Sequence, residues 1–123
     1  MPEAAQEGGE AGGVSYIHAV RAKDGETVWQ IPRRNAVVTY STPMVRELPG
    51  GKKELLLNSQ AHGLGGVDLK TGKSNWELSD VLKRRSASSP VMAGGLVFGT
   101  CGSGGGGEYL VAVKPGPKPE VKY

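Results

Sequence analysis

His62 is the residue of this chain whose type is best suited to proton transfer, and it lies in the polar stretch SQAHGLGG. Histidine titrates near neutral pH and is the usual general base where an enzyme needs one. No partner acid or nucleophile accompanies His62 in a recognisable motif. The serines further along lack the nucleophile-elbow pattern and are predicted to open turns and strands: Ser86, Ser88 and Ser89. We therefore assign no catalytic residue and keep His62 as a candidate for binding.

A second candidate is the basic run formed by Lys83, Arg84 and Arg85, whose charges could meet a phosphate. The whole chain has 15 basic and 12 acidic residues, a formal net charge of +3, and these charges are scattered. Such a mild balance is typical of an ordinary solvated surface and does not indicate a nucleic-acid partner. The three residues therefore stay candidates for contact with some other partner.

The glycine run Gly102–Gly107 satisfies the spacing G-x-G-x-x-G and follows a predicted strand. A dinucleotide site requires a helix after such a run, because the helix N-terminus binds the pyrophosphate. The residues that follow, EYLVAV, predict another strand, so we interpret the run as a flexible connection between repeat units. Cys101 is the only cysteine and has no metal-ligand spacing to His18 or His62. No disulfide, metal ligand or cofactor-binding residue is assigned.

The elements that position these residues repeat, because the chain matches itself at an offset of 47 residues. The stretch AVRAKDGETVW aligns with GVDLKTGKSNW, and a weaker third copy starts at YLVAV. The same offset relates these pairs: Trp29 and Trp76, Gly25 and Gly72, Pro43 and Pro90. A period of this length, with glycine, tryptophan and proline in phase, indicates one supersecondary unit copied along the chain.

Short apolar runs alternate with turn residues, which predicts successive antiparallel strands. The expected strands cover 16–21, 27–31, 41–46, 54–59, 64–68, 74–78, 88–92, 96–100 and 108–113. The best helical candidate, 80–85, is a turn or two in length, so the fold class is predicted to be all-β. Residues 1–13 are acidic, glycine-rich and without an apolar run. They predict a disordered lead-in that is neither a secretory signal nor a membrane span.

The repeated residue types fit a small four-stranded sheet copied along the chain. Gly72 permits the positive φ that closes a turn, and Pro90 can open a strand, where its missing N–H costs no ladder bond. Trp76 is placed to cover the gap between neighbouring sheets, because a single sheet cannot bury both of its faces. Sheets of this size that stack radially are the blades of a β-propeller.

This pattern resembles the PQQ-like, or quinoprotein-type, β-propeller repeat, whose hallmark is a tryptophan-docking run of the form A-x-D-x-x-T-G-x-x-x-W. The run VDLKTGKSNW matches it at Asp68, Thr71, Gly72 and Trp76. The run VRAKDGETVW keeps the glycine and the tryptophan, and VAVKPGPKPEVKY keeps only the first strand. SSPVMAGGLVFGT is similar to the family run that precedes the next unit. The resemblance covers roughly residues 15–123.

The resemblance implies a partial β-propeller with about two four-stranded antiparallel blades and the start of a third. The repeat units would be 15–61, 62–107 and 108–123, which places His62 in the connection between the first two units. Because a closed propeller has about four to eight blades, the resemblance also implies further blades outside this sequence.

Two functions are implied by the family. Some members are periplasmic dehydrogenases that hold pyrroloquinoline quinone and calcium and oxidise alcohols or sugars. Others, such as BamB-like outer-membrane assembly proteins, have the blades without the cofactor and act as interaction scaffolds. The adjacent cysteines of the enzymes are missing at Cys101, and no calcium-ligand motif maps onto this chain. We therefore expect a non-catalytic scaffold of the periplasm or cell envelope that binds proteins or envelope components. The alternative is a piece of a quinoprotein dehydrogenase.

Overall fold

The structure is a computed structural model, and it describes residues 14–34, 39–103 and 106–122. They form strands β1 (Val14–Val20), β2 (Thr27–Arg34), β3 (Met44–Glu47), β4 (Lys53–Ser59), β5 (Gly63–Asp68), β6 (Ser74–Leu78), β7 (Val91–Ala93), β8 (Leu96–Ser103), β9 (Gly106–Lys114) and β10 (Glu120–Val121). None of the described residues is helical, and the segment 80–85 forms turns and bends. The prediction of an all-β fold is confirmed for this part of the chain.

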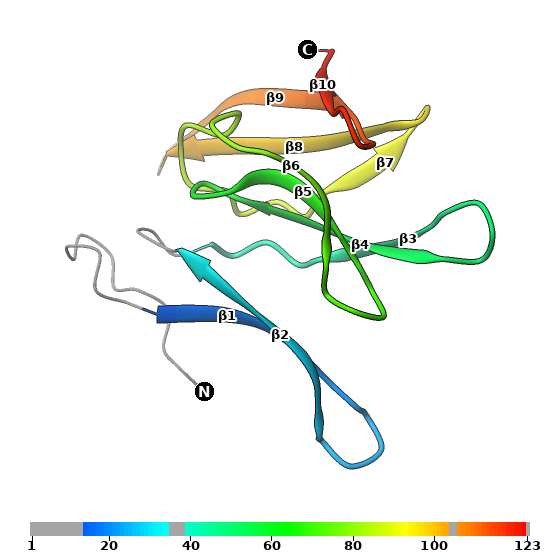
Figure 1. Cartoon of the computed structure of the whole chain (residues 1–123). Helices are drawn as coiled ribbons and strands as arrows, with labels where there is room; N and C mark the ends of the chain where they lie inside the picture. The colour runs from blue at the N-terminus through cyan, green and yellow to red at the C-terminus, as the bar shows by residue number, and fades with distance from the viewer. Residues whose placement is uncertain (1–13, 35–38, 104–105, 123) are drawn as a thin grey trace.

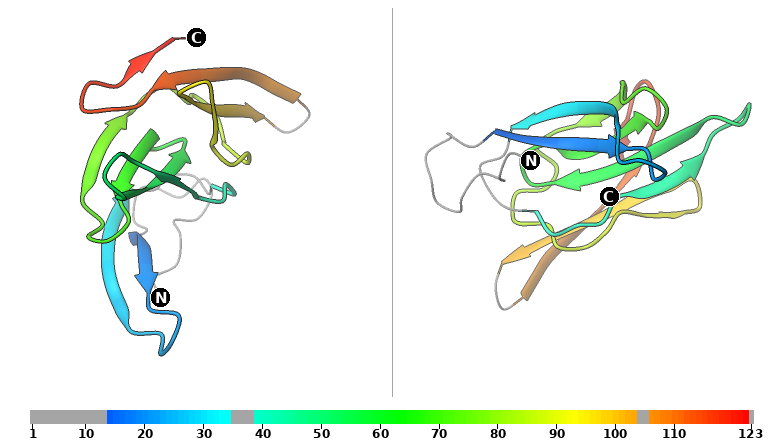
Figure 2. Two further views of the ribbon diagram at one scale, coloured as in Figure 1. Left: turned by 90° about the vertical axis from the view of Figure 1, so that its right-hand side faces the viewer. Right: turned by 90° about the horizontal axis from the view of Figure 1, so that it is seen from below.

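The strands form three antiparallel sheets (Figure 1). Sheet A is the hairpin β1-β2, sheet B has the order β3-β4-β5-β6, and sheet C has the order β7-β8-β9-β10. Figure 2 shows the sheets following one another along an arc, with β2, β6 and β10 on its outer side. Because consecutive strands are neighbours in every sheet, the chain completes one sheet before it begins the next.

The turns after β1 and β5 have the same backbone hydrogen bonds at an offset of 47 residues. The Gly25 N–H donates to the carbonyl of Arg21 at 2.7 Å, and the Gly72 N–H donates to that of Asp68 at 2.8 Å. The two glycines have φ values of 75° and 74°, in the left-handed region that a residue without Cβ adopts at little cost. The sequence repeat is therefore a structural repeat at these turns.

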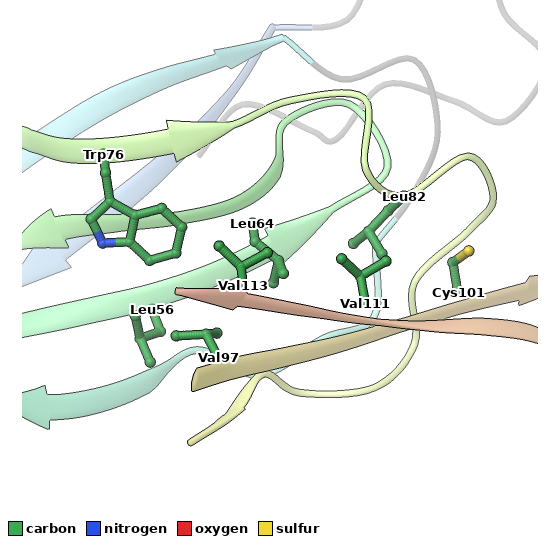
Figure 3. Close-up of a cluster of buried hydrophobic side chains, with 8 residues drawn as sticks. All are labelled: Leu56, Leu64, Trp76, Leu82, Val97, Cys101, Val111 and Val113. Carbon is green, nitrogen blue, oxygen red and sulfur yellow. The ribbon is translucent and has the colours of Figure 1, made fainter. Parts of the chain in front are cut away.

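Two apolar clusters lie between the sheets. The cluster between sheets A and B contains Trp29, Leu57 and Val67. The cluster between sheets B and C is shown in Figure 3 and consists of Leu56, Leu64, Trp76, Leu82, Val97, Cys101, Val111 and Val113. Burying a large apolar side chain contributes roughly 1.5–3 kcal/mol, so each sheet depends on its neighbour for much of its stability.

The sheets are out of phase with the predicted repeat units. The unit 15–61 contains β1 to β4, which belong to two different sheets, and the incomplete sheet is the first one rather than the last. Residues 108–123, expected to start a third unit, instead supply β9 and β10 of sheet C. Short turns join the strands within a sheet, and the longer connections follow β2 and β6. The offset fixes the length of the repeat but not the point at which a sheet begins.

The glycine run after Cys101 is not a connection between units, which corrects the prediction. Gly102 pairs with Gly107 and Ser103 with Gly106, so the described ends of the run belong to strands β8 and β9 of sheet C. A run of glycines has no side chains to show an alternating pattern. For that reason the sequence did not predict how far the two strands extend into the run.

The strands predicted at 41–46 and 88–92 start later, at Met44 and Val91. Each start directly follows one of the repeat prolines, Pro43 or Pro90, as expected for a residue without an N–H. The predicted lead-in 1–13 lies outside the described residues.

Candidate functional site

The rim cluster consists of Arg33, His62 and Glu77 and joins sheets A and B at one end of their strands. The His62 Nδ1 atom lies 3.4 Å from Glu77 Oε1, and Arg33 Nη1 donates to Glu77 Oε2 at 3.3 Å. Partial burial lowers the pKa of Arg33 below its ordinary value, and the charge of Glu77 opposes this shift. His62 lies in the turn between β4 and β5 of one sheet, not between two units as the sequence predicts.

The basic run Lys83–Arg85 lies on the connection from sheet B to sheet C, with exposed residues. The structure brings it close to the turn of His62, because Gln60 Nε2 donates to the carbonyl of Lys83 at 3.3 Å. The carbonyl of Arg85 accepts a hydrogen bond from the Gly102 N–H at 3.1 Å. The predicted binding candidates therefore lie on neighbouring loops at one rim of the molecule.

A polar seam between sheets B and C, which sequence reasoning missed, consists of Asn58, Ser86, Ser88 and Thr100. Asn58 Nδ2 donates to Ser86 Oγ at 2.8 Å and to the carbonyl of Ser88 at 2.9 Å. Ser86 Oγ donates to the carbonyl of Thr100 at 2.9 Å, and Thr100 Oγ1 donates to Ser88 Oγ at 2.6 Å. The seam ties the serine segment before β7 to sheets B and C. Its signal in the sequence was the serines in phase with the repeat prolines.

A buried carboxylate, Glu54, was missed as well. Its side chain is 2% exposed and accepts hydrogen bonds from Arg46 Nε at 2.7 Å, Asn75 Nδ2 at 2.8 Å and Trp76 Nε1 at 3.1 Å. These groups meet over Gly66, where a Cβ would lie 2.5 Å from both Glu54 Cδ and Trp76 Nε1. The three donors fit a structural role, since a buried charge needs pairing, and the crowding over Gly66 leaves no room for a ligand.

Trp29 docks sheet A onto the β5–β6 turn of sheet B. Its indole Nε1 donates to the carbonyl of Leu69 at 2.9 Å. A Cβ on Gly72 would lie 2.7 Å from Trp29 Cδ2, so only glycine lets the ring approach this closely. Trp76 is buried between sheets B and C as the sequence predicts, but its indole N–H is directed to Glu54 instead of a turn.

Asp68 stabilises the β5–β6 turn, against which Trp29 packs. Its Oδ1 accepts hydrogen bonds from the N–H groups of Lys70 at 2.8 Å and Thr71 at 2.9 Å. The Thr71 bond is the main cause that lowers the pKa of Asp68 below its ordinary value of 3.8. Thr71 Oγ1 accepts from the Lys73 N–H at 3.2 Å. Asp68, Thr71 and Gly72 thus serve the same turn.

Residues 14–34, 39–103 and 106–122 contain no group of three or more His, Cys, Asp or Glu side chains that could hold a metal ion. Nothing helical in this described part has the length and apolar character needed to cross a membrane. Comparisons with protein-family models, with curated proteins and with solved structures found no match to this chain.

Proposed function

We propose that this chain is part of a β-propeller of the PQQ-like type and acts as a non-catalytic interaction scaffold in the periplasm or cell envelope. The stacked four-stranded sheets B and C are its blades, and sheet A is the outer part of a preceding blade. Its partners are other proteins or components of the envelope.

The observation that carries this proposal is the contact of Trp29 with the turn at Gly72. It joins one sheet to the next through residues that the tryptophan-docking run repeats at a fixed offset. The matching backbone hydrogen bonds one repeat earlier, at Gly25, support the same interpretation. Sheets that stack face to face in one direction generate an arc, and continued stacking along an arc closes a propeller.

The scaffold function is supported by acidic side chains among the described residues, whose hydrogen bonds lie within a sheet or join two sheets. Glu54 and Asp68 each bind several groups of their own sheet, and Glu77 joins two sheets. The rim that carries His62 places the exposed basic residues Lys83–Arg85 on a connecting loop. Loops on a rigid scaffold are where binding residues concentrate.

Site-directed photo-crosslinking in cells tests the proposed surface. A photoreactive amino acid replaces Arg84 on this rim or, as the control, Lys52 in the turn at the opposite end of β4. We expect a defined crosslink to one envelope protein from position 84 and none from position 52. Equal crosslinking from both positions, or none from either, would contradict the proposal.

The non-catalytic part of the proposal is tested separately with cofactor. Pyrroloquinoline quinone and Ca²⁺ are added to the intact protein, which is then passed through gel filtration while the quinone absorbance is followed. We expect the quinone to separate from the protein. Co-elution of the quinone at a stoichiometric ratio would favour the quinoprotein dehydrogenase instead.

A further inference from the structure

Both methionines of the described residues face the contact between sheets B and C. Met44 lies in β3 and Met92 in β7, the first strands of the two sheets, on the inner side of the arc (Figure 2). Each is partly buried and packs against the apolar cluster between these sheets. Their strand neighbours Val45 and Val91 are 46% and 55% exposed. Because side chains alternate along a strand, the two methionines point into the interface and the two valines point away from it.

The beginnings of β3 and β7 lie side by side. The Thr42 N–H donates to Ser89 Oγ at 3.2 Å. Thr42 is two residues before Met44, and Ser89 is three residues before Met92. This hydrogen bond places the two methionines at similar levels on the facing inner strands.

The cross-strand neighbours of the methionines meet in the middle of the interface. Met44 pairs with Leu56, and Met92 pairs with Val97. Leu56 and Val97 are buried in the same cluster, and Figure 3 shows their side chains next to each other. Cross-strand neighbours on one face of a sheet are in contact. The two thioethers therefore flank one aliphatic contact and belong to the same part of the interface.

The thioether sulfur is a group of this interface that a peroxide can change. In the reaction the O–O bond breaks, one oxygen atom oxidises the sulfur to a sulfoxide, and the other oxygen leaves as water. The sulfoxide is polar, so it loses free energy when it is buried among aliphatic side chains. Cys101 supplies another sulfur to the same cluster, but its side chain is buried. Met44 and Met92 are partly exposed, so a small oxidant reaches them first.

We propose that Met44 and Met92 form an oxidation site through which a peroxide weakens the contact between sheets B and C. The sulfoxides leave the apolar cluster for water, and the inner strands β3 and β7 separate. A thiol-dependent sulfoxide reductase reverses the change: two thiols become a disulfide, the oxygen leaves as water and the thioether is restored. Sheets B and C both lie within the described residues, so this contact depends on no other strand. The inference goes beyond the scaffold function and does not depend on it.

Peptide mapping by mass spectrometry after treatment with hydrogen peroxide locates the oxidised sulfurs. We expect sulfoxides at Met44 and Met92 in the folded protein, with Cys101 still a thiol. Urea unfolding then compares the oxidised and the untreated chain. The equilibrium constant of unfolding should rise about tenfold for each sulfoxide, the effect of one polar group buried without a partner. Labelling of Cys101 by a thiol reagent should accelerate too, because the cluster that covers it opens more often.

Leucine is the matched replacement, because it has a similar volume and apolar character but no sulfur. The Met44→Leu/Met92→Leu double variant should unfold at the same urea concentration before and after peroxide. Each single variant keeps one of the two sulfurs and should change about tenfold. Met1 is present in all these variants, so its oxidation cannot account for the difference. Treating the oxidised wild type with methionine sulfoxide reductases and a thiol should restore its stability, and this measurement needs no substitution.

Three results would overturn the inference. The first is sulfoxide that forms at Met44 and Met92 only after the chain is unfolded in urea. The second is sulfoxide in the folded protein with no change in unfolding or in Cys101 labelling. The third is an equal loss of stability in the wild type and in the double leucine variant. Each of these results leaves the scaffold proposal as it stands, because neither photo-crosslinking nor quinone binding depends on the methionines.

Discussion

Replacing Gly72 with alanine should destabilise the protein far more than the same replacement at Gly25. The two glycines have φ values of 74° and 75°, so both substitutions carry the same backbone cost. Their surroundings differ. A Cβ at Gly25 meets nothing within 4 Å, whereas one at Gly72 would lie 2.7 Å from Trp29 Cδ2.

The expected loss of unfolding free energy follows from the backbone cost and from the contact with Trp29. An alanine in the left-handed region costs about 1 kcal/mol, which is the whole expected effect of Gly25→Ala. In Gly72→Ala the indole must also move. The shift sacrifices the hydrogen bond from Trp29 to the carbonyl of Leu69, worth about 1 kcal/mol. Crowding in a packed interface adds about 1 kcal/mol. We expect a total loss of about 3 kcal/mol for Gly72→Ala.

Urea unfolding followed by circular dichroism and tryptophan fluorescence measures both variants. The decisive comparison repeats the Gly72→Ala substitution in a Trp29→Ala background. Without the ring, Gly72→Ala should cost no more than Gly25→Ala does, because only the backbone term is left. If Gly72→Ala and Gly25→Ala have equal effects in the wild-type background, the docking of Trp29 against this turn is refuted.

Three further predictions concern single side chains. Glu54→Gln should lower the free energy of unfolding by about 3 kcal/mol, since it leaves the guanidinium of Arg46 without its buried partner, and the exposed Glu120→Gln is the urea-unfolding control. Asp68→Asn should remove a pH-dependent part of stability: the lowered pKa of Asp68 stabilises the fold above pH 3.8, and this contribution is lost as the pH falls through the folded-state pKa. The difference between wild type and Asp68→Asn, measured by thermal melts over a pH series, should therefore shrink in acid, and a constant difference would count against the hydrogen bonds at this turn. Cys101 is 3% exposed, so its thiol should react with a colorimetric thiol reagent only at the rate of unfolding, and fast labelling of the native protein would show that the cluster between sheets B and C is open.

The sequence was sufficient for the features that depend on local residue types. Gly25 and Gly72 have positive φ, and Trp29 and Trp76 are buried between sheets. Each of these follows from one physical property, a missing Cβ or a large apolar ring. Sequence periodicity detects such properties because every copy needs them at the same position.

Features that depend on which strands pair were not predictable in this way. A repeat has no intrinsic starting point, so its offset is the same whichever strand begins a sheet. The buried Glu54 stands next to three leucines in ELLLNS, and nothing in that run shows that Arg46 and Trp76 approach it across the sheet. His62 was placed between units for the same reason, since a turn inside a sheet and a turn between sheets use similar residues.

The two indole N–H groups have different hydrogen-bond acceptors because the turns that follow them in the next copy of the repeat differ. Trp29 meets the turn after Asp68, which has the carboxylate and the glycine that docking requires. At the corresponding place ahead of Trp76, the chain has Lys114 followed by Pro115, and no Asp-x-x-Thr-Gly turn can form. The N–H of Trp76 is accordingly satisfied by Glu54 within its own sheet. Trp29 thus finds its acceptor 40 residues downstream, in the turn of the next copy, whereas Trp76 binds a carboxylate of its own sheet.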